Sequence, residues 1–400
     1  MNIELLREDV QAFIRAHERS DIPSLMLRGI DLPGVSAVEL AGQIESRRKL
    51  APKAPVFTAT NNTYMPPKLA VEQATSQLLA EYKAQLVQGQ SFIDLTGGMG
   101  VDSYFLSQQL PQGTYCEQNE ELAQITAHNF QQLGAAIKVI TGNGMDYLQE
   151  CDTEFDVVYV DPARRGGRGQ KVFLLEDCQP NILLYWDLLL QKGKVVMIKL
   201  SPIIDIHYLI NTLPGICDVC VVAEKNEVKE VLLFAFAGNK KVPNIHAVIL
   251  AEHQSPKSFT YAWDQEKPRP IIQALEPSAT LYIPAAPVLK AQAHDHIAEA
   301  FKLHKLHPNS HLYWKADTST QPIADYLGKV LKLKAVVKID KKELHRVMPQ
   351  KKANIICKNF PLKPAEIAKK FGFKEGGDHF LIATTIEGIG KRFLIAEKIL

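Results

Sequence analysis

Short apolar segments alternate with amphipathic stretches between residues 91 and 237, and this alternation constrains the fold more than any other feature of the chain. A strand of a parallel sheet covered on both faces is apolar throughout, whereas a helix shows an apolar stripe at a spacing of three to four residues. The apolar segments therefore predict strands of one largely parallel sheet. The expected strands lie at residues 91–95, 114–117, 138–141, 155–161, 194–200, 218–223 and 231–237.

The last two expected strands are joined by a short charged segment, residues 224–230. A connection of this length cannot hold a crossover helix, so the final strand is expected to pair antiparallel with its predecessor. The chain is therefore predicted to be an α/β protein with a seven-stranded sheet that closes with an antiparallel hairpin.

The regions that flank the sheet differ from it in pattern. Before it, apolar residues at helical spacing predict a helical cap, followed by a linker rich in Pro and Asn and one helix at about 69–87. After it, weaker periodicity predicts two small α+β domains, the second of them basic. The expected divisions are 1–64 for the cap and linker, 65–240 for the sheet domain, and 241–320 and 321–400 for the small domains.

The charge is unevenly distributed along the chain, although the net charge is only +2. Residues 301–400 contain 20 Lys and Arg against 9 Asp and Glu, a surplus of 11 positive charges, and the other residues sum to −9. Lysines that face phosphates gain affinity by releasing counterions, so this distribution favours a polyanion-binding terminal domain. A lysine-rich surface that is only solvated remains the alternative.

Several classes of protein are excluded by simple features. No apolar run approaches the roughly 18 residues of a membrane span, and Glu4, Glu8 and Asp9 do not fit a secretion signal. Six scattered cysteines are too few for a disulfide framework, so a cytoplasmic protein is predicted.

No metal site is expected. Cys217 and Cys220 form a C-x-x-C pair, but they lie in an apolar, strand-like segment without a second pair to complete a zinc site. Five histidines lie between residues 294 and 311, where Pro308 interrupts any helix that would align the last of them, so they are expected in solvated loops.

The sharpest motif is FIDLTGGMGVD, residues 92–102, in which a strand ends in a carboxylate and a glycine turn leads into a helix. Glycines let the backbone approach a ligand without a Cβ clash, and the helix presents free N–H groups. The next strand ends at Glu117, about 20 residues later, where the ribose hydroxyls of a nucleoside would lie. The two features suit either a dinucleotide or S-adenosylmethionine. The pyrophosphate of a dinucleotide is disfavoured, because Ser103 replaces the third glycine and the negative charge of Asp94 in the turn would repel it.

This part of the chain resembles the class I S-adenosylmethionine-dependent methyltransferases through residues 94–100, Glu117 and residues 161–165. The resemblance implies a Rossmann-like domain whose glycine loop holds the methionine moiety and whose Glu117 binds the ribose. It also implies an adenine contact at Asn143, where an Asp is usual, with Asp146 as the alternative. The implied donor-binding residues are Asp94, Thr96, Gly97, Gly98, Gly100, Asp102, Glu117, Asn143 and Asp161.

The fourth strand ends in Asp161, Pro162, Ala163 and Arg164, which resembles the D-P-P-[YFWR] acceptor motif of nucleic-acid methyltransferases. A carboxylate and the carbonyl after it can orient a base beside the methyl donor. The expected catalytic residues are Asp161, Pro162, Arg164 and Lys199, and Arg165 and Ser201 are expected to contact the substrate. No cysteine lies at this strand end, which argues against methylation of pyrimidine C5.

Further matching segments lie at residues 64–73, 289–291 and 353–362. Through these and the two motifs above, the chain over its full length resembles a bacterial methyltransferase family with a ferredoxin-like domain and a terminal THUMP-like domain. THUMP domains bind structured RNA, so the resemblance implies tRNA or rRNA as substrate, with Lys351, Lys352 and Lys358 as contacts. Three alternatives remain: a small-molecule or protein acceptor, an RNA-binding protein whose donor domain is inactive, and a nicotinamide oxidoreductase, which the closing hairpin disfavours. The sequence does not specify the oligomeric state.

Overall fold

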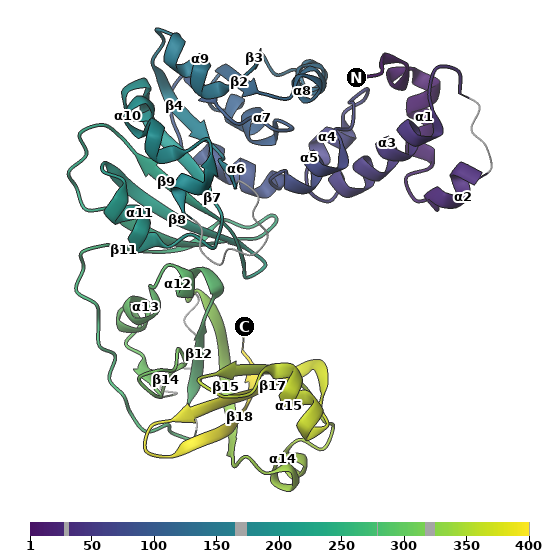
Figure 1. The fold of residues 1–400 in the computed structure, drawn as a ribbon. Helices are drawn as coiled ribbons and strands as arrows, with labels where there is room; N and C mark the ends of the chain where they lie inside the picture. The colour runs from purple at the N-terminus through teal and green to yellow at the C-terminus, as the bar shows by residue number, and fades with distance from the viewer. Residues whose placement is uncertain (28–31, 165–173, 278, 317–324, 400) are drawn as a thin grey trace. The chain divides into compact units, whose positions relative to one another are not determined.

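The computed structural model describes residues 1–27, 32–164, 174–277, 279–316 and 325–399, and the chain divides into two compact units (Figure 1). Unit 1 consists of Met1–Val219 and Val231–Lys241. Unit 2 consists of Cys220–Glu230 and Val242–Leu400.

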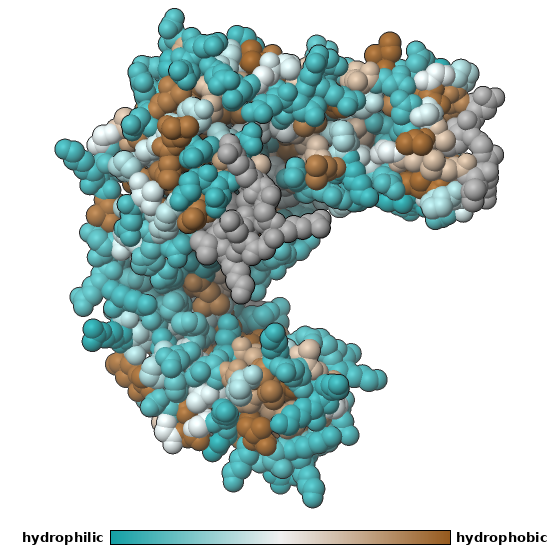
Figure 2. All heavy atoms as spheres, in the orientation of Figure 1, coloured by the Kyte–Doolittle hydropathy of each residue, from teal (hydrophilic) through white to brown (hydrophobic). Residues whose placement is uncertain are grey.

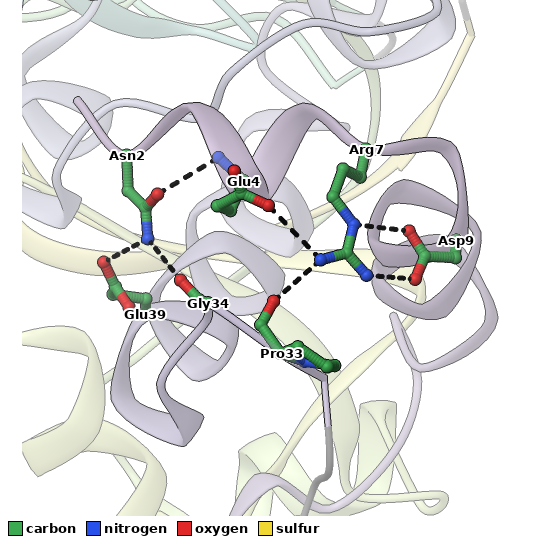
Figure 3. A network of polar contacts seen from close by, with 7 residues as sticks. All are labelled: Asn2, Glu4, Arg7, Asp9, Pro33, Gly34 and Glu39. Atoms are coloured by element: carbon green, nitrogen blue, oxygen red, sulfur yellow. Dashed lines mark hydrogen bonds and ion pairs between the residues drawn. The ribbon is translucent and has the colours of Figure 1, made fainter.

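Unit 1 begins with short helices, as the apolar spacing predicts. Their bounds are Ile3–Leu6 (η1), Glu8–Ala16 (α1), Ile22–Leu27 (α2), Ala37–Leu50 (α3) and Pro55–Ala59 (α4). A polar network ties the first residues to the start of α3 (Figure 3). In it, Asn2 donates to the Gly34 carbonyl and to Glu39, and Arg7 donates to the Pro33 carbonyl at 2.7 Å. Beneath the network, apolar residues of α1 and α3 share one buried cluster.

The helix expected at 69–87 is two helices, so this prediction is wrong. Lys68–Gln73 forms α5 and Gln77–Gln85 forms α6, and Ala74 between them is extended, with φ −60° and ψ 147°. The Ser76 hydroxyl accepts a hydrogen bond from the Leu79 amide and caps α6. Because an N-cap residue has non-helical dihedrals, the chain leaves the helix here and begins a new one.

The larger sheet confirms the predicted α/β fold. Within the described residues it has nine strands rather than the expected seven, in the order β11-β10-β8-β9-β7-β4-β1-β2-β3, because Asn244–Leu250 (β10) and Lys257–Ala262 (β11) extend it beyond β8. β1 pairs parallel with β2 and β4, and β9 pairs antiparallel with β7. The bounds are Ser91–Asp94 (β1), Gln112–Glu117 (β2), Ile137–Thr141 (β3), Phe155–Val160 (β4), Gly193–Leu200 (β7), Ile216–Glu224 (β8) and Glu227–Ala235 (β9).

The closing hairpin is tighter than expected. The segment 224–230 was expected to connect the strands, but β8 continues to Glu224 and β9 begins at Glu227. Lys225 and Asn226 both have positive φ, 51° and 64°, which is the backbone of a two-residue type I′ turn. This turn matches the right-handed twist of the strands, and β8 and β9 are hydrogen-bonded neighbours in the sheet.

Helices connect the parallel strands, and their bounds are Val101–Ser107 (α7), Glu120–Gln132 (α8), Gly144–Glu150 (α9), Ile182–Lys192 (α10) and Ile206–Thr212 (α11). After β4, Ala163–Arg164 (β5) pairs with Cys178–Gln179 (β6), and Leu175–Asp177 forms a 3-10 helix (η2). Because the strands are parallel, the carboxyl ends of β1, β2, β4 and β7 lie at one edge of the sheet.

Unit 2 contains a second sheet, with the order β13-β14-β12-β15-β18-β17-β16, and the antiparallel strands β10 and β11, which continue the first sheet beyond β8. The strands are Asn244–Leu250 (β10), Lys257–Ala262 (β11), Thr280–Pro284 (β12), His304–Lys305 (β13), Tyr313–Lys315 (β14), Gly328–Val337 (β15), Lys352–Lys358 (β16), Lys374–Ile386 (β17) and Gly390–Lys398 (β18). The helices are Ala286–Lys290 (α12), His294–Ala300 (α13), Lys341–Val347 (α14) and Pro364–Phe371 (α15). β15 pairs with both β12 and β18, so a single sheet contains strands from both sides of residue 320, where the two small domains were expected to meet. The domain divisions stay a prediction.

On the face that Figure 2 shows, hydrophobic residues are scattered among hydrophilic ones. Isolated exposed apolar residues of this kind are normal for a folded protein surface. In the part of the chain that the structure describes, no helix combines the length and apolar character needed to cross a membrane.

Candidate functional site

A cavity of about 660 Å³ lies in unit 1 at the carboxyl ends of the parallel strands. Its wall includes the glycine loop, Glu117, Asn143, Asp161 and Lys199, together with Ala70 and residues 73–75 before β1. Ligand sites typically have volumes of roughly 300–1,000 Å³. The structure thus gathers residues from the ends of five strands and from the α5–α6 junction around one space.

The glycine loop passes too close to its neighbours to carry side chains at two positions. A Cβ on Gly97 would lie 2.0 Å from the ring of Tyr115. A Cβ on Gly100 would lie 2.6 Å from Thr126, and Gly100 also has φ of +80°, where glycine is favoured. The loop is therefore pressed against β2 and α8, and its other side faces the cavity.

Asp94 is a buried carboxylate at the end of β1. The Ser103 hydroxyl donates to it at 2.5 Å, and the Thr96 amide donates to it at 3.0 Å. Burial is the main cause that raises the pKa of Asp94 to about 7. The two hydrogen bonds lower the pKa, and the negative charges of Asp102 and Asp161 raise it further. Asp94 thus titrates near neutral pH.

Glu117 ends β2 and faces the glycine loop. It accepts a hydrogen bond from the Gly98 amide at 2.9 Å and one from the Asn119 amide at 2.8 Å. Each carboxylate oxygen has a second lone pair, so the oriented group can still accept from hydroxyls of a ligand.

Asn143 lines the cavity but also has a structural contact. Its side-chain oxygen accepts from the Met145 amide at 3.0 Å and caps α9. The next residue, Gly144, packs so closely on β1 that an added Cβ would lie 2.4 Å from the Leu95 carbonyl oxygen. Asp146, the alternative adenine contact, is not among the residues that line the cavity.

Asp161 and Lys199 meet at the rim of the cavity. The Lys199 ammonium pairs with the Asp161 carboxylate, and the Asp161 amide donates to the Thr96 hydroxyl at 2.7 Å. The ion pair joins the ends of β4 and β7, and the hydrogen bond fixes Asp161 to the glycine loop. The structure therefore brings together the two residues that the sequence placed at separate strand ends.

The other expected acceptor residues are placed differently. Pro162 is buried and is not part of the cavity wall, and Ser201 accepts from the Ile203 amide at 3.4 Å, also outside the wall. Arg164 pairs through its backbone with Cys178, while Arg165 lies outside the described residues.

The three expected RNA contacts lie in unit 2, on or next to β16. Lys351 and Lys352 precede and begin the strand and are exposed, whereas Lys358 ends it. Burial lowers the pKa of Lys358. At about 3.3 Å per residue, the two ends of β16 are about 20 Å apart, so these lysines do not form one cluster.

The structure adds residues to the site that the sequence did not indicate. Tyr159 lines the cavity, and Lys83 lies fully buried behind it. No local motif marks Lys83, because its place depends on how α6 packs against α7.

The cysteine pair and the histidines are engaged in packing. Cys220 is buried, and the Cys217 thiol lies 3.3 Å from the Phe234 carbonyl oxygen. His294 and His296 are buried in unit 2, so the expectation of solvated loops is wrong for these two: they lie on α13, against its neighbours. Across the residues that the structure describes, no group of three or more potential ligands is arranged to hold a metal ion.

Comparisons with known families match three parts of the chain. Residues 47–177 match the model of conserved hypothetical protein 95, residues 281–326 a ferredoxin-like domain, and residues 328–398 a THUMP domain-like family. Comparison with curated proteins gives no match.

One solved structure aligns over almost the whole chain. It is described as a “putative methyltransferase from Porphyromonas gingivalis W83”, with 30% identity, a TM-score of 0.87, and coverage of 98% of this chain and 97% of that one. Two others align over less of the chain. An O-methyltransferase from Bacillus cereus in complex with SAH has 14% identity, a TM-score of 0.33, and coverage of 47% and 99%. A T. thermophilus 16S rRNA methyltransferase in complex with AdoMet and guanosine has 14% identity, a TM-score of 0.31, and coverage of 43% and 43%.

The strand order with its antiparallel β9, the glycine loop after β1 and the acidic end of β2 define a class I S-adenosylmethionine-dependent methyltransferase. Within this class, the chain belongs to the same family as the Porphyromonas gingivalis protein.

The residues of the cavity fit the donor S-adenosylmethionine. The close-packed glycines leave the loop backbone facing the cavity, and Glu117 is held so that it can accept from ribose hydroxyls. Four carboxylates and two lysines lie in or next to the wall, namely Asp94, Asp102, Glu117, Asp161, Lys83 and Lys199. This excess of negative charge suits a donor that carries a sulfonium and an ammonium against one carboxylate.

Proposed function

We propose that the protein methylates a base in structured RNA, either tRNA or rRNA, in the cytoplasm. The observation that carries the proposal is the position of Asp161, which lies at the rim of the donor cavity and is oriented by both Lys199 and Thr96. The THUMP domain-like match and the surplus of positive charge in residues 301–400 support RNA as the acceptor.

In this proposal Asp161 accepts a hydrogen bond from an amino or ring N–H group of the base, and the backbone carbonyl beside it orients the ring. Lys199 keeps the carboxylate in one orientation through a charge-assisted contact. When bound, the donor supplies an electrophilic methyl group. The protein then contributes mainly by holding the base in line with it and excluding water.

Pro162, Arg164 and Arg165 follow Asp161 directly and complete the proposed acceptor segment. An arginine guanidinium can stack on a base or bind a phosphate, so Arg164 takes the place of the aromatic residue in the D-P-P-[YFWR] motif. Ser201 lies outside the cavity wall, and we assign it a contact with the RNA backbone rather than with the base.

The test is transfer of labelled methyl groups from S-adenosylmethionine to RNA from cells that lack the gene. Asp161→Asn keeps the shape of the side chain and removes its charge, so we expect a loss of about 100-fold in rate. Calorimetric affinity for the donor should change much less. Asp152→Asn, at an exposed position, is the matched control and should leave the rate unchanged.

The outcomes separate the proposal from its alternatives. Label that enters RNA with the wild type and the control, but not with Asp161→Asn, supports base methylation. Donor binding without label in RNA would bring small-molecule or protein acceptors forward. Equal transfer by Asp161→Asn and the wild type would show that Asp161 is not at the acceptor site.

A further inference from the structure

Lys83 of α6 is a charged side chain that is buried almost completely, with 1% of its surface exposed. Its ammonium lies 3.0 Å from the Asp102 carboxylate and donates to the Thr75 hydroxyl at 3.1 Å. An isolated ammonium in a protein interior is costly, and it is tolerated only where it is paired and hydrogen-bonded. The two partners supply this pairing.

Asp102 is held from a second side by another residue of the cavity. The Tyr159 hydroxyl of β4 donates to the other Asp102 oxygen at 2.8 Å. Asp102 lies in the first turn of α7, directly after the glycine loop. Asp102, Thr75 and Tyr159 all line the donor cavity, whereas Lys83 does not. Lys83 thus lies behind the wall and contacts two polar residues that line the cavity.

We propose that Lys83 is a positioning residue of the donor site, and that through it the α5–α6 junction forms part of the subsite for the amino-acid end of the donor. Thr75 lies in this junction, and its oxygen accepts from Lys83, so its own proton is available for a carboxylate. Asp102 provides a negative charge for an ammonium. A zwitterionic α-amino acid group needs a hydrogen-bond donor for its carboxylate and a negative charge for its ammonium. Lys83 holds both of these partners, Thr75 and Asp102, in place.

Unit 2 offers a matched control for this network. Lys305 is also buried, with 6% of its surface exposed, and its ammonium lies 2.9 Å from Asp295. The Tyr313 hydroxyl donates to the same carboxylate at 2.7 Å. Both networks contain a Lys, an Asp and a Tyr, so replacing either lysine removes a buried Lys–Asp ion pair. The network of Lys83 also includes Thr75, and Asp295 also lies 3.7 Å from His294. Only the one with Lys83 belongs to the donor cavity.

The experiment compares Lys83→Met and Lys305→Met in the full chain. Binding of S-adenosylmethionine and S-adenosylhomocysteine is measured by calorimetry, and stability by thermal unfolding. Both variants should unfold at lower temperature, because each leaves a buried carboxylate without its partner. We expect only Lys83→Met to weaken binding of both ligands, on the order of ten-fold, as expected when contacts to charged groups are lost.

A double variant, Lys83→Met with Asp102→Asn, keeps the test decisive if the single variant does not fold. It removes both charges, so stability should recover while affinity for both ligands stays low. The proposal is overturned if the double variant binds them like the wild type, or if Lys83→Met and Lys305→Met change the affinity equally. Because the readout is donor binding alone, it is independent of whether RNA is the acceptor.

Discussion

At the scale of single residues, Asp94 shows how a buried carboxyl of the donor site lowers the free energy of unfolding. Burial raises the pKa of its carboxyl from 3.8 to about 7, so the folded protein holds this proton more tightly than the unfolded chain does. The free energy of unfolding therefore decreases as the pH rises from about 4 to about 7. Since one pKa unit corresponds to about 1.4 kcal/mol, this carboxyl contributes a loss of about 4 kcal/mol across the window.

Asp94→Asn removes this titration and keeps the shape of the side chain. We expect the wild type to lose stability relative to Asp94→Asn by several kcal/mol between about pH 4 and pH 7. Chemical denaturation at a series of pH values measures the difference. Asp152→Asn is an exposed control that should follow the wild type. A difference between wild type and Asp94→Asn that does not change with pH would contradict the burial of an ionisable group at this position.

The residues of the donor site divide into those a sequence can indicate and those it cannot. Gly97, Gly100 and Glu117 could be predicted because their roles depend on a local strand, turn and helix. Lys83 could not, because its contacts are made by tertiary packing between segments with no motif.

At the scale of elements, the strands of unit 1 could be predicted because buried parallel strands are apolar along their whole length. The break between α5 and α6 was missed because residues 74–76 contain neither Gly nor Pro, and the apolar spacing continues from Val71 to Leu79. β10 was missed for a related reason. Its seven residues lie in a segment rich in Pro and His, and their burial depends on pairing that the sequence does not show.

The β8–β9 turn gives a prediction at this scale. Lys225 has φ of 51°, a conformation that costs an L-residue roughly 1–2 kcal/mol and glycine almost nothing. Glycine also increases the entropy of the unfolded chain, which offsets part of this gain. Lys225→Gly should therefore raise the free energy of unfolding by about 0.5 kcal/mol. Chemical denaturation measures the change.

Lys229→Gly provides the control for this prediction, because it makes the same replacement inside β9. Glycine within a strand is unfavourable, so this variant should be less stable than the wild type. If both variants lost stability equally, the turn would not have the strained backbone that the positive φ values indicate.

At the scale of the whole molecule, the charge distribution separates two kinds of binding. The surplus of 11 positive charges in residues 301–400 is almost cancelled by −9 in the rest of the chain. Binding of RNA through phosphates releases counterions and weakens steeply with salt. The donor is a small zwitterion with one extra positive charge, so its affinity should depend only weakly on salt.

The proposed RNA contacts can therefore be tested by salt dependence rather than by affinity alone. Lys351 and Lys352 are exposed and adjacent, and replacing both with Gln should lower RNA affinity. If each contacts one phosphate, the slope of log affinity against log salt should become shallower by about 1.4–1.8. Filter binding at several salt concentrations measures the slope.

The matched control is the double replacement of Lys240 and Lys241, which are also exposed and adjacent but lie in unit 1. It removes the same charge from the chain and should leave the slope close to that of the wild type. Equal slopes for the two double variants would mean that RNA responds to net charge alone. A shallower slope only after replacement of Lys351 and Lys352 would place phosphates at the start of β16, because counterion release counts local contacts rather than total charge.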